Sequence, residues 1–161
     1  MKTIRFGLSV GSIAAARKEL QLYKQEVGKK IELVVSRLIA EGAEIARNEI
    51  ISLGAVDSGE LYKSLDGLIY TDGKSGIVFT DCPYAGFVEF GTGVVGENNP
   101  HPVVPWQYDV YQHGEFGWVY YDEEANRFRW TKGMPSRPFM YNTSMELLDR
   151  AEKIAKAVFQ S

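Results

Sequence analysis

The first third of the chain has the hydrophobic pattern of a long amphipathic helix. Apolar residues recur three and four positions apart from about residue 13 to residue 53, and charged or polar residues occupy the other faces. The apolar residues near this one face are Leu20, Val27, Ile31, Val34, Leu38, Ile45 and Leu53. Ser12 is a suitable N-cap for this helix, and Gly54 is a suitable C-cap.

This predicted helix is long for so small a protein. Without a break it would measure about 60 Å, at ~1.5 Å per residue. Gly28 and Gly42 each cost roughly 1 kcal/mol relative to alanine, so we expect the helix to break there. Packing in the core accounts for most of the apolar face. One small core cannot cover the whole length, however, and a second subunit could cover the rest.

Residues 1–12 alternate in polarity instead of following the helical period. Apolar residues occupy positions 4, 6, 8 and 10, with polar residues or glycine between them, which is typical of a half-buried strand. A signal peptide is the competing interpretation, but Arg5 interrupts the apolar run. We predict a strand, or an arm that pairs with another subunit.

The middle of the chain predicts an antiparallel sheet. A turn at residues 57–59 and a short helical turn at 61–65 precede strands at 68–71, 77–80 and 84–90. The Asp-Gly-Lys-Ser sequence at 72–75 is a strong hairpin signal between the first two strands. Short links between three consecutive strands favour an antiparallel meander.

Residues 94–131 are expected to form an insertion made of a loop and a β-hairpin. Prolines and asparagines predict a long loop over 94–116. Two strands at 117–121 and 127–131 then flank a polar turn. The aromatic residues that can share one face of this hairpin are Trp118, Tyr120, Phe128 and Trp130. They either pack against one another or offer a contact surface to a partner.

The last residues predict a second helix. Thr143 and Glu146 have the spacing of a capping box at its start. Its apolar stripe consists of Leu147, Ala151, Ile154 and Val158. The whole pattern predicts one α+β domain over residues 1–161. In this domain, the long N-terminal helix and the C-terminal helix pack on one face of an antiparallel sheet, and the aromatic hairpin is an insertion.

Composition narrows the function. The 161 residues carry a net charge of −3 with both signs mixed, which argues against general nucleic-acid binding because that normally needs a basic face. Cys82 is the single cysteine, so no internal disulfide can form, and a reducing compartment such as the cytoplasm fits. No run approaches the roughly 20 apolar residues of a membrane helix.

Candidate chemistry is sparse. The two histidines, His101 and His113, lie in the predicted loop, and neither histidines nor cysteines have the spacing of a zinc site. The sequence contains no Gly-x-Ser-x-Gly elbow. Glu89 could serve a hydrolase, but no second carboxylate is implied by spacing. We therefore expect a protein that is not an enzyme, without catalytic, cofactor-binding or metal-binding residues, and keep a Glu89 hydrolase as the weaker alternative.

One stretch combines unusual features, Tyr84-Ala85-Gly86-Phe87-Val88-Glu89-Phe90-Gly91-Thr92-Gly93. Its last glycines predict a positive φ angle or a close backbone approach. Glu89 lies between bulky aromatic residues, and Arg137 lies between two prolines. A buried charge without a partner costs several kcal/mol. We hypothesise that Glu89 and Arg137 form an ion pair, within one subunit or across an interface.

Three segments together resemble the tail-completion, or head–tail joining (neck), family of long-tailed bacteriophages. Members carry a Tyr-Ala-x-x-x-Glu-Phe-Gly-Thr core, a variable insertion, and an Arg-Pro-Phe segment that leads into the last helix. Here these are residues 84–92, 94–130 and 137–139, with the insertion longer than the minimum. The third segment, Asp57-Ser58-Gly59-Glu60-Leu61-Tyr62-Lys63-Ser64-Leu65, is similar to the family's Thr/Ser-Gly-x-Leu-x-x-Ser turn.

The resemblance implies a structural protein of a phage or prophage that completes the tail, or joins it to the head, as a homo-oligomeric ring. Head-closure or connector proteins and tail-terminator or tail-tube proteins would be its neighbours in the virion, assembled in the host cytoplasm. Genomic DNA would pass through the ring without sequence-specific contacts, and no cofactor is implied. A non-catalytic binding module that uses the loop and hairpin is the alternative. The expected structural or interface residues are Tyr84, Glu89, Phe90, Gly91, Thr92, Trp118, Tyr120, Phe128, Trp130, Arg137, Pro138 and Phe139.

Overall fold

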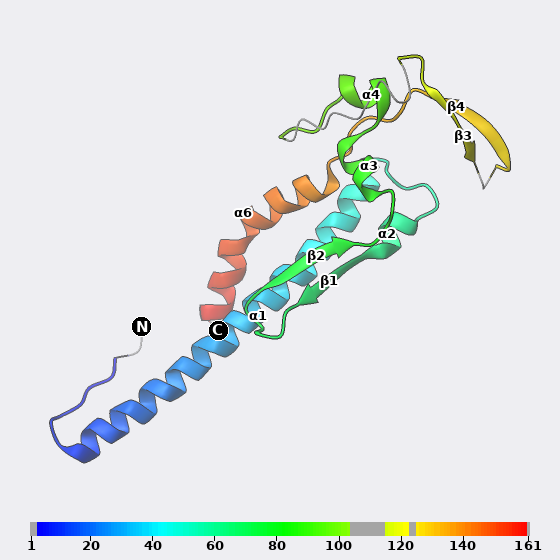
Figure 1. The fold of residues 1–161 in the computed structure, drawn as a ribbon. Coiled ribbons are helices and arrows are strands. Elements are labelled where there is room, and N and C mark those ends of the chain that lie inside the picture. The colour runs from blue at the N-terminus through cyan, green and yellow to red at the C-terminus, as the bar shows by residue number, and fades with distance from the viewer. Residues whose placement is uncertain (1–2, 104–114, 123–124, 161) are drawn as a thin grey trace.

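The computed structural model describes residues 3–103, 115–122 and 125–160, and its longest element is helix α1 (Figure 1). α1 spans Val10–Ser52 without a break. The expected breaks at Gly28 and Gly42 are therefore wrong, because the propensity cost of two glycines is small beside the cooperativity of 43 helical residues. Close packing explains the glycine at position 42, since a Cβ atom there would lie 3.0 Å from Val78 and 3.2 Å from Leu147.

The ends of α1 follow local capping rules. Ser9, three residues before the predicted cap, is the N-cap and accepts the N–H of Ser12. The Ser12 hydroxyl instead accepts the N–H of Gly7. Gly54 follows the helix with a φ angle of +62°, as expected for the left-handed residue that ends a helix. Residues 3–9 form no strand within the chain and lie outside the fold as an arm.

The predicted α+β class is confirmed, with a long N-terminal helix, a C-terminal helix and two small antiparallel sheets. The C-terminal part of α1 lies in the middle of the molecule: strands β1 and β2 cover one side of it, and helix α6, Phe139–Gln160, runs along another (Figure 1). β1 spans Leu65–Ile69 and β2 spans Gly76–Thr80. The short helix α2, Glu60–Ser64, precedes them as predicted.

The first sheet has two strands, not the expected three. Leu65 pairs with Thr80, and Ile69 pairs with Gly76, at the two ends of the ladder. The predicted third strand is instead helix α3, Ala85–Phe90, so the expected meander is wrong. In a segment of only six residues, the helical period of 3.6 and the strand period of 2 are hard to tell apart. In the helix that forms, Ala85, Val88 and Glu89 are buried, whereas Phe87 is exposed.

The insertion contains more regular structure than the sequence predicts. Helix α4, Gly93–Asn98, occupies the start of the expected loop, and residues 104–114 lie outside the described part of the chain. The predicted hairpin is present as β3, Trp118–Asp122, and β4, Arg127–Thr131, and it forms its own two-stranded sheet. It projects from the end of the molecule opposite the start of α1 (Figure 1).

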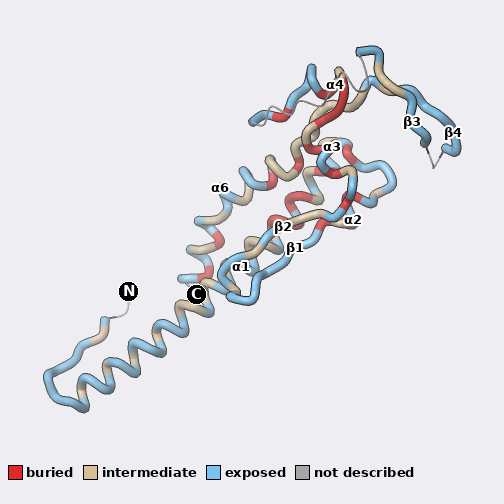
Figure 2. Tube along the Cα trace, viewed as in Figure 1, coloured by how far each residue is buried: buried red, intermediate tan, exposed pale blue. Residues whose placement is uncertain are grey.

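The buried core lies at one end of α1. Its members come from α1, α2, β1, the segment around α3 and the start of α6, and they include Ala46, Ile50, Leu61, Leu65, Val88 and Phe139. Along α1 the first buried residue is Gly42, and all earlier positions are exposed or half-buried (Figure 2). The core thus holds only about the last quarter of the long helix, which agrees with the expectation that one small core cannot cover its whole length.

Candidate functional site

The carboxylate of Glu89, at the end of α3, caps the start of α6. Its Oε2 atom accepts the backbone N–H of Met140 at 2.9 Å, and its Oε1 atom accepts that of Tyr141 at 2.9 Å. Glu89 is only 7% exposed. A carboxylate at this position suits both the unpaired N–H groups of a first helical turn and the positive end of the helix dipole.

This arrangement satisfies the N-terminus of α6 completely. Pro138 precedes the helix and has no N–H group. The N–H of Phe139 donates to the carbonyl of Arg137, and the N–H of Asn142 makes the first regular helical bond, to Pro138. The predicted capping box at Thr143 is therefore wrong. The helix starts four residues earlier, and the Thr143 hydroxyl donates to the carbonyl of Phe139.

His101, which lies in the predicted variable loop, belongs to this site. It is 7% exposed, its Nε2 atom lies 3.3 Å from Glu89 Oε1, and its Nδ1 atom accepts the N–H of Val103. Because Nδ1 is an acceptor, the proton of the neutral ring belongs on Nε2, from which it donates to Glu89. The ring also packs against Phe90 and Tyr141, with centroids 5.1 and 5.3 Å away. No periodic pattern marks this histidine, because all of these contacts are tertiary.

The Gly91-Thr92-Gly93 segment forms a backbone clasp with the segment before α6. Thr92 and Met134 exchange N–H···O bonds of 2.9 and 3.1 Å as an antiparallel bridge. Gly91 and Gly93 have φ angles of +79° and +60°. A Cβ atom on Gly91 would lie 2.7 Å from the backbone nitrogen of Ser136. Both predictions for these glycines, a positive φ angle and a close backbone approach, are confirmed.

The hypothesised ion pair of Glu89 with Arg137 is wrong within the chain. Both residues are described, and Glu89 uses its carboxylate for α6 and His101 instead. The two segments nevertheless meet through the backbone. The N–H of Arg137 donates to the carbonyl of Val88 at 2.8 Å, and the Ser136 hydroxyl donates to the carbonyl of Glu89 at 2.6 Å. A pairing across an interface stays a prediction.

Tyr84, directly before α3, connects the segment at 57–65 to the site around Glu89. Its hydroxyl accepts the N–H of Leu61 at 3.2 Å and lies 3.4 Å from the Ser58 hydroxyl. Burial raises the pKa of the Tyr84 hydroxyl above its ordinary value of 10.0, although the bonds from Ser58 and Leu61 partly oppose the rise. The segments at 57–65, 84–93 and 133–140 therefore converge in space, although they are far apart in sequence.

The aromatic hairpin distributes its side chains differently from the prediction. Val119 lies opposite Trp130, and Tyr121 lies opposite Phe128, so these four residues share one face. Trp118 lies opposite Thr131, and Tyr120 lies opposite Arg129, so these two aromatic residues are on the other face of the hairpin. The expectation that Trp118, Tyr120, Phe128 and Trp130 share one face is wrong.

The two hairpin faces differ in their surroundings. The indole of Trp118 packs over Gly93, where a Cβ atom would come within 2.8 Å of the ring. We call the opposite side the free hairpin face. Its members are exposed by 61% (Val119), 48% (Tyr121), 74% (Phe128) and 58% (Trp130). Such exposure of four neighbouring apolar side chains is typical of a contact surface.

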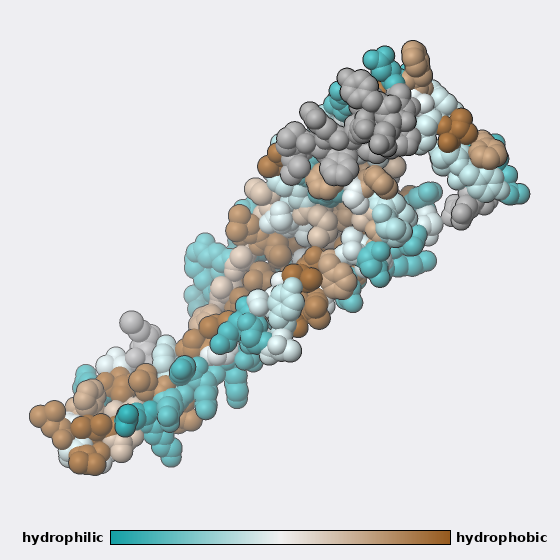
Figure 3. Space-filling view, viewed as in Figure 1, coloured by the Kyte–Doolittle hydropathy of each residue, from teal (hydrophilic) through white to brown (hydrophobic). Residues whose placement is uncertain are grey.

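A second uncovered surface lies at the other end of the molecule. No residue from 10 to 29 is buried, and we call this segment the free half of α1. Its exposed apolar residues include Val10, Ile13, Leu20 and Leu22. Figure 3 shows hydrophobic side chains gathered on this end of the molecule. Within the described residues, no helix combines the length and apolar composition needed to cross a membrane.

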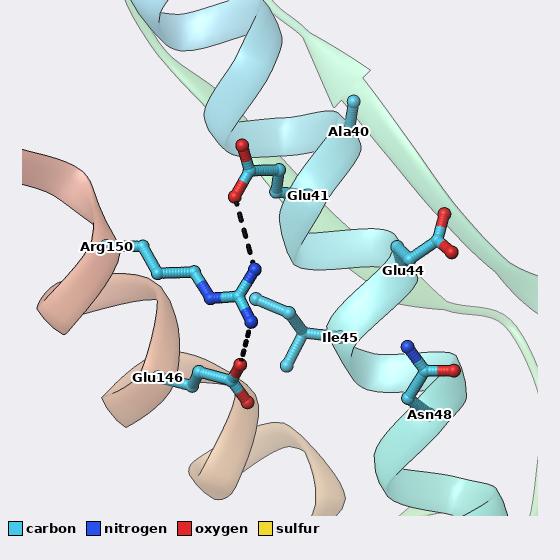
Figure 4. A pocket seen from close by; sticks show the side chains of 7 residues that line it. All are labelled: Ala40, Glu41, Glu44, Ile45, Asn48, Glu146 and Arg150. Carbon is cyan, nitrogen blue, oxygen red and sulfur yellow. Dashed lines mark hydrogen bonds and ion pairs between the residues drawn. The ribbon is translucent and has the colours of Figure 1, made fainter. Parts of the chain in front are cut away.

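A surface hollow lies beside the contact between the middle of α1 and α6 (Figure 4). Arg150 of α6 reaches across it to Glu41 of α1, at 3.6 Å, and also pairs with Glu146 of its own helix. All three side chains are well exposed, so the pairs contribute little to stability. No group of three or more potential metal ligands occurs among the described residues. The charged side chains of this hollow therefore pair with one another where α1 and α6 meet.

Glu89 is poorly placed for the hydrolase alternative. Both of its carboxylate oxygens already accept backbone N–H groups, and the side chain is buried. A general acid or base must reach a proton on the substrate. Its geometry is that of a structural cap.

The comparisons with known proteins agree with this structural character. Residues 18–91 match the model of the family described as "Bacteriophage HK97-gp10, putative tail-component", which covers a little under half of the 161 residues. No curated protein and no solved structure matches the chain. The matched region contains most of α1, the first sheet and the Glu89 cap, and it ends at Gly91. Residues 18–91 are therefore similar to the HK97-gp10-like family of putative phage tail components.

Proposed function

We propose that this protein acts at the neck or tail end of a long-tailed phage or prophage, where it joins tail to head or completes the tail as a homo-oligomeric ring. The family supports a tail component, and the observation that carries the ring is the pair of uncovered surfaces. The free half of α1 and the free hairpin face lie at opposite ends of the molecule (Figure 1). A closed ring needs such a heterologous contact, in which two different patches meet.

The charge of the chain suits this position. With a net charge of −3, the protein would not hold DNA that passes through the ring. Its neighbours would be the head-closure or connector protein on one side and the tail-terminator or tail-tube protein on the other. The protein would then be a part of the virion.

Mass photometry of the purified chain and the electron microscopy of its particles test the proposal. We expect a single closed species of fixed subunit number that stays the same as concentration rises. Deletion of the gene from its phage should yield filled heads and finished tails that do not join. Infectious virions with joined heads and tails after deletion would contradict a neck role.

A binding module is the second candidate, because the free hairpin face exposes four apolar side chains, three of them aromatic. In that case the isolated chain would be a monomer that binds a glycan or peptide through this face. Titration with glycan and peptide panels separates the two functions, since a ring component should give no saturable binding that Trp130→Ala abolishes.

A further inference from the structure

We infer that the free hairpin face of one copy packs on the free half of α1 of the next copy. This inference rests on the proposed ring and assigns the two surfaces that meet in it. The free hairpin face consists of Val119, Tyr121, Phe128 and Trp130. The free half of α1 is residues 10–29.

The apolar stripe on the free half continues an interface that exists within the chain. Ile13, Leu20, Val27 and Val34 follow one another at intervals of seven residues, and the same interval leads to Glu41. Residues seven apart lie on nearly the same line of a helix. Glu41 contacts Arg150 of α6, so the end of this line at Glu41 lies beside α6. From there the line turns around α1 by about 20° per seven residues toward Ile13.

α6 does not extend far enough to cover the rest of this stripe. The Lys30 ammonium donates to the carbonyl of Phe159, which places the last turn of α6 beside Lys30. The free half therefore presents about 30 Å of helix, at ~1.5 Å per residue, whose apolar residues α6 does not cover. A five-residue strand is about 17 Å long, so a hairpin fits within that length.

Charge argues against pairing of two free halves with each other. The free half, residues 10–29, contains four basic residues, Arg17, Lys18, Lys24 and Lys29, and two acidic residues, for a net charge of +2. Two such segments side by side would repel. The hairpin carries the opposite sign. Residues 117–131 contain three acidic residues and two basic ones, for a net charge of −1.

Aromatic faces also attract cations directly. The Lys132 ammonium already lies 5.7 Å from the ring centroid of Trp130. Lys24 and Arg17 flank the apolar stripe of α1 and could approach Tyr121 and Phe128 in the same way. Tryptophan, tyrosine and arginine side chains are common anchors of protein interfaces.

Geometry excludes the contact within one chain. The hairpin and the free half of α1 project from opposite ends of the molecule (Figure 1). One copy cannot bring its own two surfaces together, whereas a head-to-tail arrangement covers both surfaces of every copy with a single type of contact. Closure of that arrangement gives a ring.

Two variants test the assignment. The first, Ile13→Glu with Leu20→Glu, breaks the stripe on α1 and keeps the hairpin. The second, Val119→Lys with Phe128→Lys, breaks the free hairpin face and keeps α1. All four positions are at least 40% exposed, so both variants should fold, as circular dichroism and melting would verify. The controls are Leu148→Glu, an exposed leucine on α6, and Tyr120→Lys, on the other face of β3.

We expect each double variant alone to be a monomer under conditions in which the wild-type chain assembles. Mixed in equal amounts, they should form a 1:1 heterodimer and nothing larger, because the mixture offers one intact hairpin and one intact helix. The controls should assemble like the wild-type chain. Light scattering with size-exclusion chromatography measures all of these masses.

Other results would overturn the inference while the ring stands. Dimers of the first variant alone would show hairpin–hairpin contact, and dimers of the second would show helix–helix contact. A mixture that stays monomeric, variants that still form rings, or loss of assembly with Tyr120→Lys would place the interface elsewhere. A wild-type chain that is monomeric at every concentration would instead contradict the proposed ring itself.

Discussion

The carboxylate of Glu89 accepts the backbone N–H of Tyr141 at 2.9 Å, across 52 positions of sequence. The family match ends at residue 91, so this bond ties the matched part of the chain to a helix outside it. α6 has no side-chain cap of its own, because a proline precedes it. A single buried side chain thus determines where the second long helix starts.

Replacement of Glu89 should destabilise the fold strongly. Glu89→Ala removes a charge-assisted cap and leaves two N–H groups without a partner, so we expect a loss of about 2–4 kcal/mol in the free energy of unfolding. Glu89→Gln should cost about 1–2 kcal/mol, since its single carbonyl oxygen keeps part of the cap without the favourable charge. Urea unfolding followed by circular dichroism measures both.

Glu60 provides the matched control for this prediction. It lies in the first turn of α2 and is exposed. Glu60→Gln should change the free energy of unfolding by no more than about 0.5 kcal/mol. Equal effects of the Gln substitutions at positions 60 and 89 would show that the cap does not contribute as argued.

His101→Ala should loosen one region and leave the rest of the fold intact. The substitution removes the contact with Glu89 and the packing against Phe90 and Tyr141. We expect amide hydrogen exchange to rise in residues 93–103, while β1 and β2 keep their protection. Uniform loss of protection over the whole chain would instead indicate a global role for this histidine.

Tyr84→Phe should have an effect that depends on pH. At neutral pH the variant loses the bond from the Leu61 N–H, for which we expect a cost of about 1 kcal/mol. In the wild-type chain, burial raises the pKa of Tyr84 in the folded state above 10.0, so folding favours the neutral hydroxyl. That contribution is complete below about pH 10 and is lost as pH rises through the raised pKa.

The stability difference between the wild-type chain and Tyr84→Phe should therefore shrink above about pH 10. Urea midpoints measured from pH 8 to pH 11 follow this difference. Tyr70→Phe, at an exposed tyrosine, is the control for the loss of a tyrosine hydroxyl. A constant difference for Tyr84→Phe would contradict the assigned burial effect.

Two glycine substitutions should act in opposite directions. Gly133 has a φ angle of +100°, and a Cβ atom there would lie 1.9 Å from the carbonyl oxygen of Thr92. Gly133→Ala should therefore cost about 3 kcal/mol. Gly28→Ala has open space within α1 and should stabilise the chain by about 0.5–1 kcal/mol. Thermal melting would compare the two, and similar shifts in melting temperature would refute the close approach at Gly133.

The two tryptophans of the hairpin should separate assembly from stability. Trp130 is 58% exposed, so Trp130→Ala should weaken assembly at least tenfold with a small change in melting temperature. Trp118 packs over Gly93, so Trp118→Ala should lower the melting temperature as well. Mass photometry and calorimetry on the same samples measure the two properties. Equal losses of both properties for Trp130→Ala would mark it as a core residue.

The hairpin shows how far local signals reach. The polar turn and flanking aromatic residues predict the two strands correctly, within one residue at each end. Which residues lie opposite each other in the hairpin depends on the exact length of the turn. A change of register by one residue moves every side chain of a strand to the opposite face. The sequence therefore predicts that a hairpin forms, and only its pairing shows which side chains are free.

The sequence by itself determined the long helix, the first hairpin, the aromatic hairpin and the glycines of the clasp, because these depend on periodicity and backbone conformation within a few residues. The tertiary structure decided that residues 85–90 are helical, that α6 starts at Phe139 and that His101 is buried. The physical reason is the same in each case: the groups that satisfy these backbone and side-chain atoms are supplied by segments far away in the chain. No local pattern records which distant carboxylate will reach a helix end.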